Sequence, residues 1–219
     1  MIMINVLYIH GMGGGGDSRI PSILNSFFCN SGEYGHENVR VVVRTYDFDP
    51  EKAHVQIMAW VEELQPRLVI GESLGSIHAI RISGVPHLLI SPALNAPSFL
   101  AAASWLTLIP GVSRLLCRIY KPREGDRQAM DFSFGLLRKY SAHMKAALSN
   151  SPAMGSRDFF VAFIGLRDHY RKSGVVSIRS WKKYFGDTAV LYDGIHFTEE
   201  EHIYAVIIPE ICRILNIKR

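Results

Sequence analysis

The sequence predicts a doubly wound α/β fold with a mostly parallel sheet of about six strands, in one domain that covers residues 1–219. Short, continuous apolar runs alternate along the chain with stretches of helical periodicity. This alternation is typical of a parallel sheet that helices bury on both faces. A chain of 219 residues, of which 48% are hydrophobic and 20% charged, can bury one substantial core, which excludes a disordered protein.

Each of the six apolar runs stops at a glycine or a polar residue, as strands commonly do where they leave a sheet. The predicted strands are Ile4–Ile9, Val39–Tyr46, Leu68–Ile70, His87–Ile90, Phe159–Ile164 and Thr188–Tyr192. The segments between them carry apolar residues at helical spacing. The predicted helices around the sheet are Ser18–Phe28, Pro50–Leu64, Leu74–Ser83, Gly174–Phe185 and Thr198–Leu215.

The segment between the fourth and fifth predicted strands is longer than a single crossover helix requires. Nearly 70 residues separate Ile90 from Phe159, whereas most connections in compact domains are far shorter. We therefore expect a helical cap, inserted into the sheet domain at about residues 93–157. The helices predicted within it are Ser98–Leu108, Val112–Tyr120 and Asp131–Leu148.

Composition and charge narrow the possible partners and the compartment. The three cysteines include no Cys-x-x-Cys pair, so they indicate neither a disulfide framework nor a metal site and favour a reducing, cytoplasmic compartment. The net charge of +4 comes from scattered basic residues, and we expect no nucleic-acid partner. We expect no signal peptide and no integral membrane segment, because Pro110-Gly111 and Arg114 interrupt the most apolar stretch, residues 99–116.

The strongest chemical signal is Gly71-Glu72-Ser73-Leu74-Gly75, between a predicted strand and a predicted helix. This is the Gly-x-Ser-x-Gly pattern of a nucleophile elbow, a sharp turn that presents a serine hydroxyl. Side chains two positions before and after the serine would collide in such a turn, which explains the glycines. Ser73 is therefore the predicted nucleophile.

A glycine-rich loop, His10-Gly11-Met12-Gly13-Gly14, follows the first predicted strand. Backbone N–H groups in such a loop can turn toward the negative oxygen that develops during acyl transfer. We expect the N–H of Met12, or that of Gly13, to bind this oxyanion together with the N–H of Leu74.

A serine nucleophile needs a general base and an acid that orients the base. Asp168 follows the fifth predicted strand, and His196 follows the sixth. Because the carboxyl ends of parallel strands meet at one edge of a sheet, both side chains are expected to converge on Ser73. Asp193 is the rival acid, but it lies only three positions before His196.

Together these residues resemble an α/β-hydrolase-fold serine hydrolase: His10-Gly11 after the first strand, the elbow around Ser73, then Asp168 and His196. The resemblance covers nearly the whole chain. Within this fold the chain is most similar to small YqiA-like esterases, through residues 165–170 and through His196-Phe197-Thr198 before the last helix. It departs from larger members by having fewer predicted strands, and from the small subgroup by its longer cap.

The resemblance implies a hydrolase that cleaves a carboxylic ester or thioester through an acyl-enzyme intermediate on Ser73, with no cofactor and no metal. The substrate is expected to be a small molecule. The apolar segment after the fourth strand, in particular Trp105 and Leu106, is expected either to form an acyl pocket facing Ser73 or to pack on the sheet as core.

Two alternatives remain open. Residues Gly11 to Gly16 also fit the dinucleotide-binding pattern Gly-x-Gly-x-x-Gly, which would indicate a nucleotide-binding oxidoreductase. That pattern expects an acidic residue about 20 positions on, whereas Asp47 follows Gly16 by 31 positions. The second alternative is a binding protein that keeps the fold without catalysis.

Overall fold

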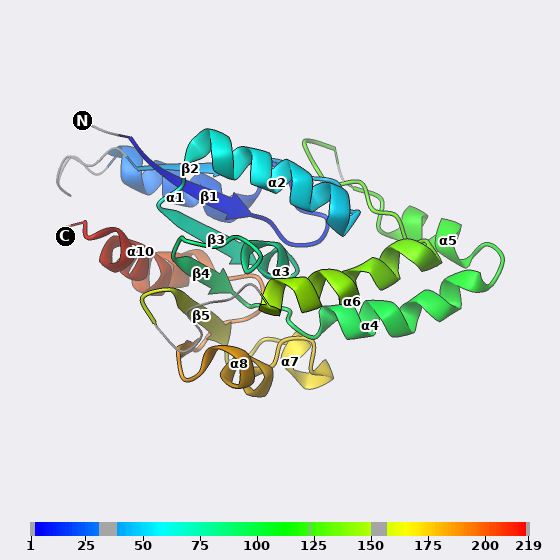
Figure 1. Cartoon of the computed structure of the whole chain (residues 1–219). Helices are drawn as coiled ribbons and strands as arrows, with labels where there is room; N and C mark the ends of the chain where they lie inside the picture. Colours follow the sequence, from blue (N-terminus) through cyan, green and yellow to red (C-terminus); the bar gives the residue numbers. More distant parts are fainter. Residues whose placement is uncertain (1–2, 31–38, 123, 150–156, 218–219) are drawn as a thin grey trace.

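A computed structural model describes residues 3–30, 39–122, 124–149 and 157–217. Within these residues, six strands form one sheet in the order β2-β1-β3-β4-β5-β6, and every neighbouring pair is parallel (Figure 1). The strands are β1 (Ile4–Ile9), β2 (Val39–Val43), β3 (Leu68–Glu72), β4 (His87–Ile90), β5 (Phe160–Gly165) and β6 (Ala189–Tyr192). The predicted doubly wound sheet is confirmed.

Helices cover both faces of this sheet. Alternate residues of a strand point to opposite faces, so Leu7 and Ile9 of β1 belong to one apolar core, whereas Val6 and Tyr8 belong to the other. The first core is covered by α2, α3, α6 and α8, and the second by α1, η2 and α10. None of the described helices combines the length and the apolar character that crossing a bilayer would require. The helices flanking the sheet are α1 (Arg19–Asn30), α2 (Pro50–Leu64), α3 (Gly75–Ala79), α7 (Tyr170–Ser173), α8 (Ile178–Phe185), α9 (Glu200–His202), the π-helix η2 (Ile203–Ile207) and α10 (Ile208–Leu215).

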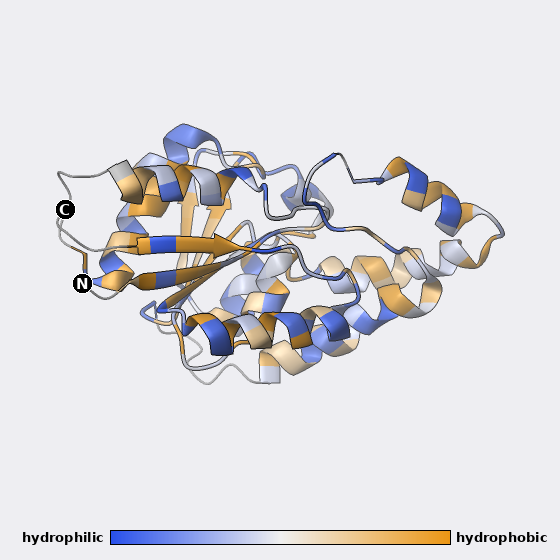
Figure 2. Ribbon diagram, turned by 90° about the horizontal axis from the view of Figure 1, so that it is seen from above, coloured by the Kyte–Doolittle hydropathy of each residue, from blue (hydrophilic) through white to orange (hydrophobic). Residues whose placement is uncertain are grey.

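The long segment between β4 and β5 is helical, as expected. It contains α4 (Ala96–Ser104), the 3₁₀ helix η1 (Trp105–Leu108), α5 (Val112–Ile119) and α6 (Phe134–Ser149). Helix α4 packs along α6, and this group extends beyond the sheet at the end of the molecule opposite to both termini (Figures 1 and 2). Residues 150–156, near the end of the predicted cap (93–157), lie outside the described residues.

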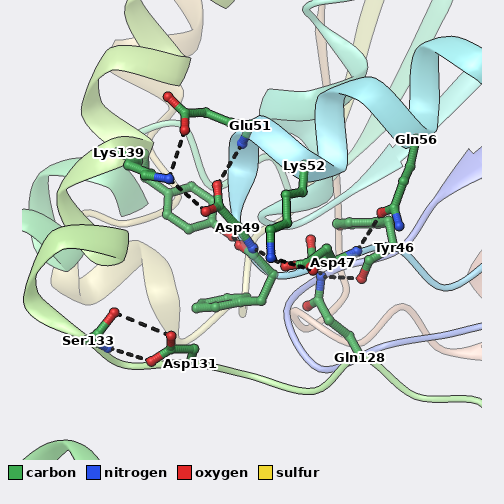
Figure 3. Close-up of polar contacts among 12 residues, drawn as sticks. Tyr46, Asp47, Asp49, Glu51, Lys52, Gln56, Gln128, Asp131, Ser133 and Lys139 are labelled. Atoms are coloured by element: carbon green, nitrogen blue, oxygen red, sulfur yellow. Dashed lines mark hydrogen bonds and ion pairs between the residues drawn. The ribbon is translucent and has the colours of Figure 1, made fainter.

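Helix α6 is tied to the start of α2 by charge and by a buried hydrogen bond. The Nζ of Lys139 lies 2.7 Å from a carboxylate oxygen of Asp49 and 2.7 Å from one of Glu51 (Figure 3). Burial alone would raise the pKa of Asp49, but hydrogen bonds from Lys139 and from the backbone N–H of Glu51 hold it below its usual value. The hydroxyl of Tyr140 donates to the carbonyl of Phe48 at 2.7 Å. One turn of α6 is thereby fixed to the residues that begin α2.

Two predicted helices differ in the structure, one in where it begins and one in its regularity. Gly174 adopts a φ of 83° and ends α7, and Ser177 then caps α8 by accepting the backbone N–H of Ser180. The helix predicted over Gly174–Phe185 therefore begins only at Ile178, because the left-handed Gly174 ends the preceding helix. In the last helical stretch the π-turn η2 precedes Pro209, which has no N–H to continue the regular ladder.

His87 is a buried histidine at the start of β4. Its Nε2 lies 3.0 Å from the carbonyl oxygen of Ala79, and its ring stacks on that of Phe160. Burial lowers the pKa of His87 to about 4, compared with about 6.5 in an unfolded chain. Between these two values the unfolded chain takes up a proton that the folded chain does not bind. The free energy of unfolding therefore falls as the pH falls from about 6.5 to about 4.

The titration of His87 is expected to lower the free energy of unfolding of the wild type by about 3 kcal/mol between pH 7 and pH 4. We predict that His87→Gln abolishes this pH-dependent decrease. A glutamine amide can still donate to the carbonyl of Ala79 but does not titrate. Chemical denaturation at both pH values measures the effect, and His169→Gln, at an exposed position, is the matched control. An equal loss in the wild type and in His87→Gln would contradict the prediction.

Candidate active site

Ser73 lies in a sharp turn between β3 and α3. Its φ of 49° is in the left-handed region, which costs about 1–2 kcal/mol for a residue with a Cβ. Neighbouring backbone holds the turn on both sides: the N–H of Ser73 donates to the carbonyl of Ile90 (2.9 Å), and its own carbonyl accepts the N–H of Ala93 (3.1 Å). The turn places the Ser73 hydroxyl at the carboxyl end of β3.

Gly71 and Gly75 allow the strand, the turn and the helix to pack closely. A Cβ on Gly71 would lie 2.8 Å from the Cβ of Ala79, and one on Gly75 would lie 2.3 Å from the carbonyl oxygen of His10. Neither distance can be accommodated without displacing a neighbour. The steric reason that the sequence motif predicts for these glycines is therefore present in the structure.

The structure brings Ser73, His196 and Asp168 together in one hydrogen-bonded chain. The Nε2 of His196 lies 3.0 Å from the Oγ of Ser73, and its Nδ1 lies 2.8 Å from the Oδ2 of Asp168. The Oδ1 of Asp168 accepts the backbone N–H of Tyr170 at 2.8 Å. Burial alone would raise the pKa of Asp168, but the hydrogen bonds from His196 and Tyr170 hold it below its usual value. Asp168 is therefore a carboxylate that can fix the tautomer of the His196 ring.

The rival acid is paired with a residue outside this hydrogen-bonded chain. Asp193 is 77% exposed and forms an ion pair with Arg167 at 2.7 Å. The exposed ring of His169 packs on Tyr170, with 4.1 Å between the ring centroids, and lies edge-on to the ring of His196 at 5.8 Å. Of the two candidate acids, Asp168 is the one that contacts His196. No group of three or more histidine, cysteine or acidic side chains within the described residues is arranged to hold a metal ion.

Two backbone N–H groups near Ser73 have no hydrogen-bond acceptor among the described residues. The N–H groups of Met12 and Leu74 make no hydrogen bond within the described part of the chain, and both residues line the cavity at the site. The N–H of Gly13, by contrast, donates to the Oε1 of Gln128 at 3.2 Å. Of the three N–H groups considered for an oxyanion, those of Met12 and Leu74 thus have free donor capacity.

The second half of the glycine loop holds another segment of the protein. The carbonyl of Gly14 accepts the N–H of Gln128 at 2.7 Å, and Gly15 pairs with Arg127 in an antiparallel bridge. A Cβ on Gly15 would lie 1.7 Å from the carbonyl oxygen of Asp126. The close backbone approach that a dinucleotide phosphate needs at such glycines is made here by residues 126–128. The geometry therefore does not favour the dinucleotide-binding alternative.

Gln128 is a buried residue of the site that no sequence motif indicates. Besides accepting the N–H of Gly13, it donates from its Nε2 to the carbonyl of Tyr46 at 3.2 Å (Figure 3). The hydroxyl of Tyr46 donates to the carbonyl of His10 at 2.5 Å, and the two rings stack at 4.2 Å. Gln128 and Tyr46 thus hold the loop after β1 in place.

A cavity of about 420 Å³ opens beside Ser73 and His196. Its wall is largely apolar, as is usual for sites that bind small organic molecules. Tyr170 and Phe197 line it next to His196. Phe197 directly follows His196, and Tyr170 lies two positions after Asp168. The remaining apolar lining includes Leu74, Ala96, Phe99, Leu100 and Val175.

The structure does not bring Trp105 and Leu106 to this cavity. They lie beyond the end of α4, where Trp105 is 60% exposed and its ring lies 5.2 Å from that of Phe134. Instead, Phe99 and Leu100, one to two turns earlier in α4, line the cavity where Trp105 and Leu106 were expected. The whole segment is apolar, so its composition does not indicate which part turns toward Ser73.

No known family profile and no curated protein sequence matches this chain significantly. Solved structures do match in fold. One comes from work on LipS and LipT, two metagenome-derived lipolytic enzymes, with a TM-score of 0.61 at 16% identity, covering 97% of this chain and 94% of that chain. Est1E from Butyrivibrio proteoclasticus with bound ferulic acid gives 0.62 at 13% identity, covering 97% and 88%. A structure from work on carboxylesterases of the thaumarchaeon Nitrososphaera gargenis gives 0.55 at 12% identity, covering 97% and 91%.

The chain has the α/β-hydrolase fold, since these structures match it along almost its whole length. The predicted fold is therefore confirmed. These matches do not test the closer resemblance to YqiA-like esterases, which stays a prediction.

We predict that Gly75→Ala lowers the free energy of unfolding by about 3 kcal/mol, because its Cβ would press against the carbonyls of Ile9 and His10 at the end of β1. Gly135→Ala is the matched control, since a Cβ at this exposed position in α6 meets no atom within 4 Å. Chemical denaturation compares the two variants. Equal stabilities would show that the tight turn does not require Gly75.

Proposed function

We propose that this protein is a serine hydrolase that cleaves a carboxylic ester or thioester through an acyl-enzyme intermediate. The observation that carries the proposal is the hydrogen-bonded chain from Ser73 through His196 to Asp168, beside an apolar cavity. A nucleophile, a base within hydrogen-bond reach and an acid that orients the base are what acyl transfer needs. The lipolytic enzymes and carboxylesterases that share the fold support the same class of reaction.

The geometry supports the following path for the proton in the first step. The Oγ of Ser73 attacks the acyl carbon while the Nε2 of His196 accepts the hydroxyl proton. The imidazolium that forms is stabilised at its Nδ1 by the carboxylate of Asp168, 2.8 Å away. His196 then returns the proton to the departing alcohol or thiol, which leaves the acyl group on Ser73.

The second step removes the acyl group with water. His196 takes a proton from the water as it attacks, and returns it to the Oγ of Ser73. In both steps the negative charge develops on the acyl oxygen, and the N–H groups of Met12 and Leu74 are the donors proposed to stabilise it. Because these donors belong to the turns after β1 and β3, they are in place before the substrate binds.

We also propose that residues 93–157 act as a cap on a single domain. Phe99 and Leu100 of α4 supply part of the cavity wall, while Ser73 and His196 supply its reactive end. An acyl chain that leaves Ser73 toward α4 would be buried against these side chains. The substrate class that this favours is an ester or thioester with an apolar acyl group.

We predict that Ser73→Ala lowers kcat by about 10⁶-fold, the loss measured when a serine protease loses its nucleophile, with no change in the circular dichroism spectrum. Hydrolysis of p-nitrophenyl esters measures turnover, and a fluorophosphonate probe reports whether the serine reacts. Wild-type turnover in Ser73→Ala would contradict the mechanism. A wild-type protein that neither reacts with the probe nor hydrolyses esters would instead be the non-catalytic binding protein.

The acid has its own matched pair of variants. Asp168→Asn is expected to lower kcat by about 10⁴-fold, because an amide holds the imidazole in the wrong tautomer. Asp193→Asn removes the rival carboxylate, which pairs with Arg167, and is expected to leave kcat nearly unchanged. The reverse outcome would assign the acid to Asp193.

We predict that kcat/KM rises by about fourfold for each methylene added to the acyl chain, until the cavity is filled, since burial of a methylene is worth about 0.8 kcal/mol. Phe99→Ala should flatten this rise because it removes part of the cavity wall, whereas Trp105→Ala should retain it. The measurement is a series of p-nitrophenyl esters from acetyl to octanoyl. A flat series for the wild type would reject the acyl pocket.

A further inference from the structure

The outer end of the helical segment carries a group of exposed apolar side chains. We call it the apolar tip, and each of its members is more than half exposed. It spans η1, the turn that follows it, and α5. Its members are Trp105, Leu106, Leu108, Ile109, Leu115 and Ile119. Large contiguous apolar surfaces on a soluble domain generally mark an interaction site.

Helix α5 presents a mixed apolar and basic stripe at this tip. Its inner side is anchored, since Leu116 and Cys117 pack against the core and the Sγ of Cys117 contacts the carbonyl of Met130. The exposed positions of the helix are residues 114, 115, 118 and 119. Arg114 and Arg118 therefore lie beside Leu115 and Ile119 on the outward side, one turn apart.

The charged residues of α4, η1 and α5 and of the turns that join them are all basic. No aspartate or glutamate occurs between Ser73 and Arg123, whereas Arg114, Arg118 and Lys121 follow one another closely around α5. All three cations are exposed. Two copies of this chain that met through their tips would bring these like charges together, which disfavours a homodimer at this surface.

The tip projects away from the rest of the molecule. Figures 1 and 2 show α5 and the adjoining end of α4 at the end of the molecule opposite to the termini, beyond the edge of the sheet. The tip is also held by packing: the ring of Trp105 lies 5.2 Å from that of Phe134 and under the guanidinium of Arg138. The apolar side chains are therefore presented outward by a packed group of helices.

We propose that the apolar tip is a docking surface for a bilayer that contains anionic lipids. Leucine, isoleucine and tryptophan side chains bind at the boundary between headgroups and acyl chains, where tryptophan is favoured. Arginine and lysine can keep their charged ends among the lipid phosphates while their stems stay in the apolar layer. An anionic bilayer complements both the apolar side chains and the basic residues around α5.

The continuous stretch of α4 and η1 connects the cavity wall to the apolar tip. Phe99 and Leu100 line the cavity, and Trp105 follows one to two turns later along α4 and η1. A bilayer bound at the tip would thus lie next to the helix that forms part of the cavity. Docking itself involves none of Ser73, Asp168 or His196, so it holds whether or not the protein is a hydrolase.

The experiment is vesicle co-sedimentation with the Ser73→Ala protein, so that binding is measured without hydrolysis. Vesicles of phosphatidylcholine mixed with phosphatidylglycerol are compared with vesicles of phosphatidylcholine alone. We expect binding to the mixed vesicles, a weaker interaction with the neutral ones, and release at high salt. The fluorescence of Trp105, at an exposed position, should shift to the blue on binding, and this shift should be absent in Trp105→Phe.

Paired variants separate the two contributions. Arg114→Gln with Arg118→Gln should lower affinity for the mixed vesicles by about 25-fold, about fivefold for each cation. Leu115→Ser with Ile119→Ser should lower it by at least about tenfold through the loss of apolar burial. Val55→Ser in α2, at a position 70% exposed, and Lys182→Gln with Lys183→Gln in α8 are the matched controls, and both should bind as the parent does.

Three outcomes would overturn the proposal. The first is no binding to the mixed vesicles, and the second is binding that the control variants weaken as much as the tip variants do. The third is a dimer in light scattering that Leu115→Ser with Ile119→Ser dissociates, which would assign the surface to a second copy of the chain. None of these depends on esterase activity, so docking and the proposed function fail independently.

Discussion

The left-handed backbone of Ser73 is the constraint on which the rest of the site depends. A residue with a Cβ holds this conformation only where its surroundings over-determine it. Here the backbone of β4 and the residues after it supply hydrogen bonds to Ser73, while Gly75 brings α3 against the carbonyls that end β1. The turn therefore needs β1, β3, β4 and α3 in contact, and the packing of the sheet fixes the direction of one hydroxyl group.

The strand order then determines what can meet that hydroxyl. The chain moves from β1 to β2 on one side and returns to β3 on the other, so the turns after β1 and β3 flank the point where the order reverses. Ligand sites in open α/β sheets lie at such points. Asp168 and His196 reach the same edge because they follow β5 and β6, although 123 positions separate Ser73 from His196.

The sequence was sufficient to predict the sheet and the three side chains that meet at its edge, because each of the three follows an apolar run that ends in a recognisable turn. Gln128 could not be predicted, since a glutamine in a loop is usually solvated, and its burial depends on the distant carbonyl of Tyr46 and N–H of Gly13. The choice between Phe99 and Trp105 for the cavity was likewise beyond the sequence. Both belong to one apolar segment, and only the packing of α4 along α6 decides which of them turns inward.

The helical segment between β4 and β5 is fixed to the sheet domain at its inner end and exposes apolar side chains at its outer end. The same helices therefore form both the cavity wall and the apolar tip. Near the sheet, Lys139 pairs with Asp49 and Glu51, and Gln128 is buried among backbone groups of the site. At the outer end, α5 exposes leucine, isoleucine and arginine. Closely packed helices transmit displacement because they cannot be compressed. A partner that holds the tip would therefore also constrain α4, and with it the Phe99 side of the cavity that faces Ser73.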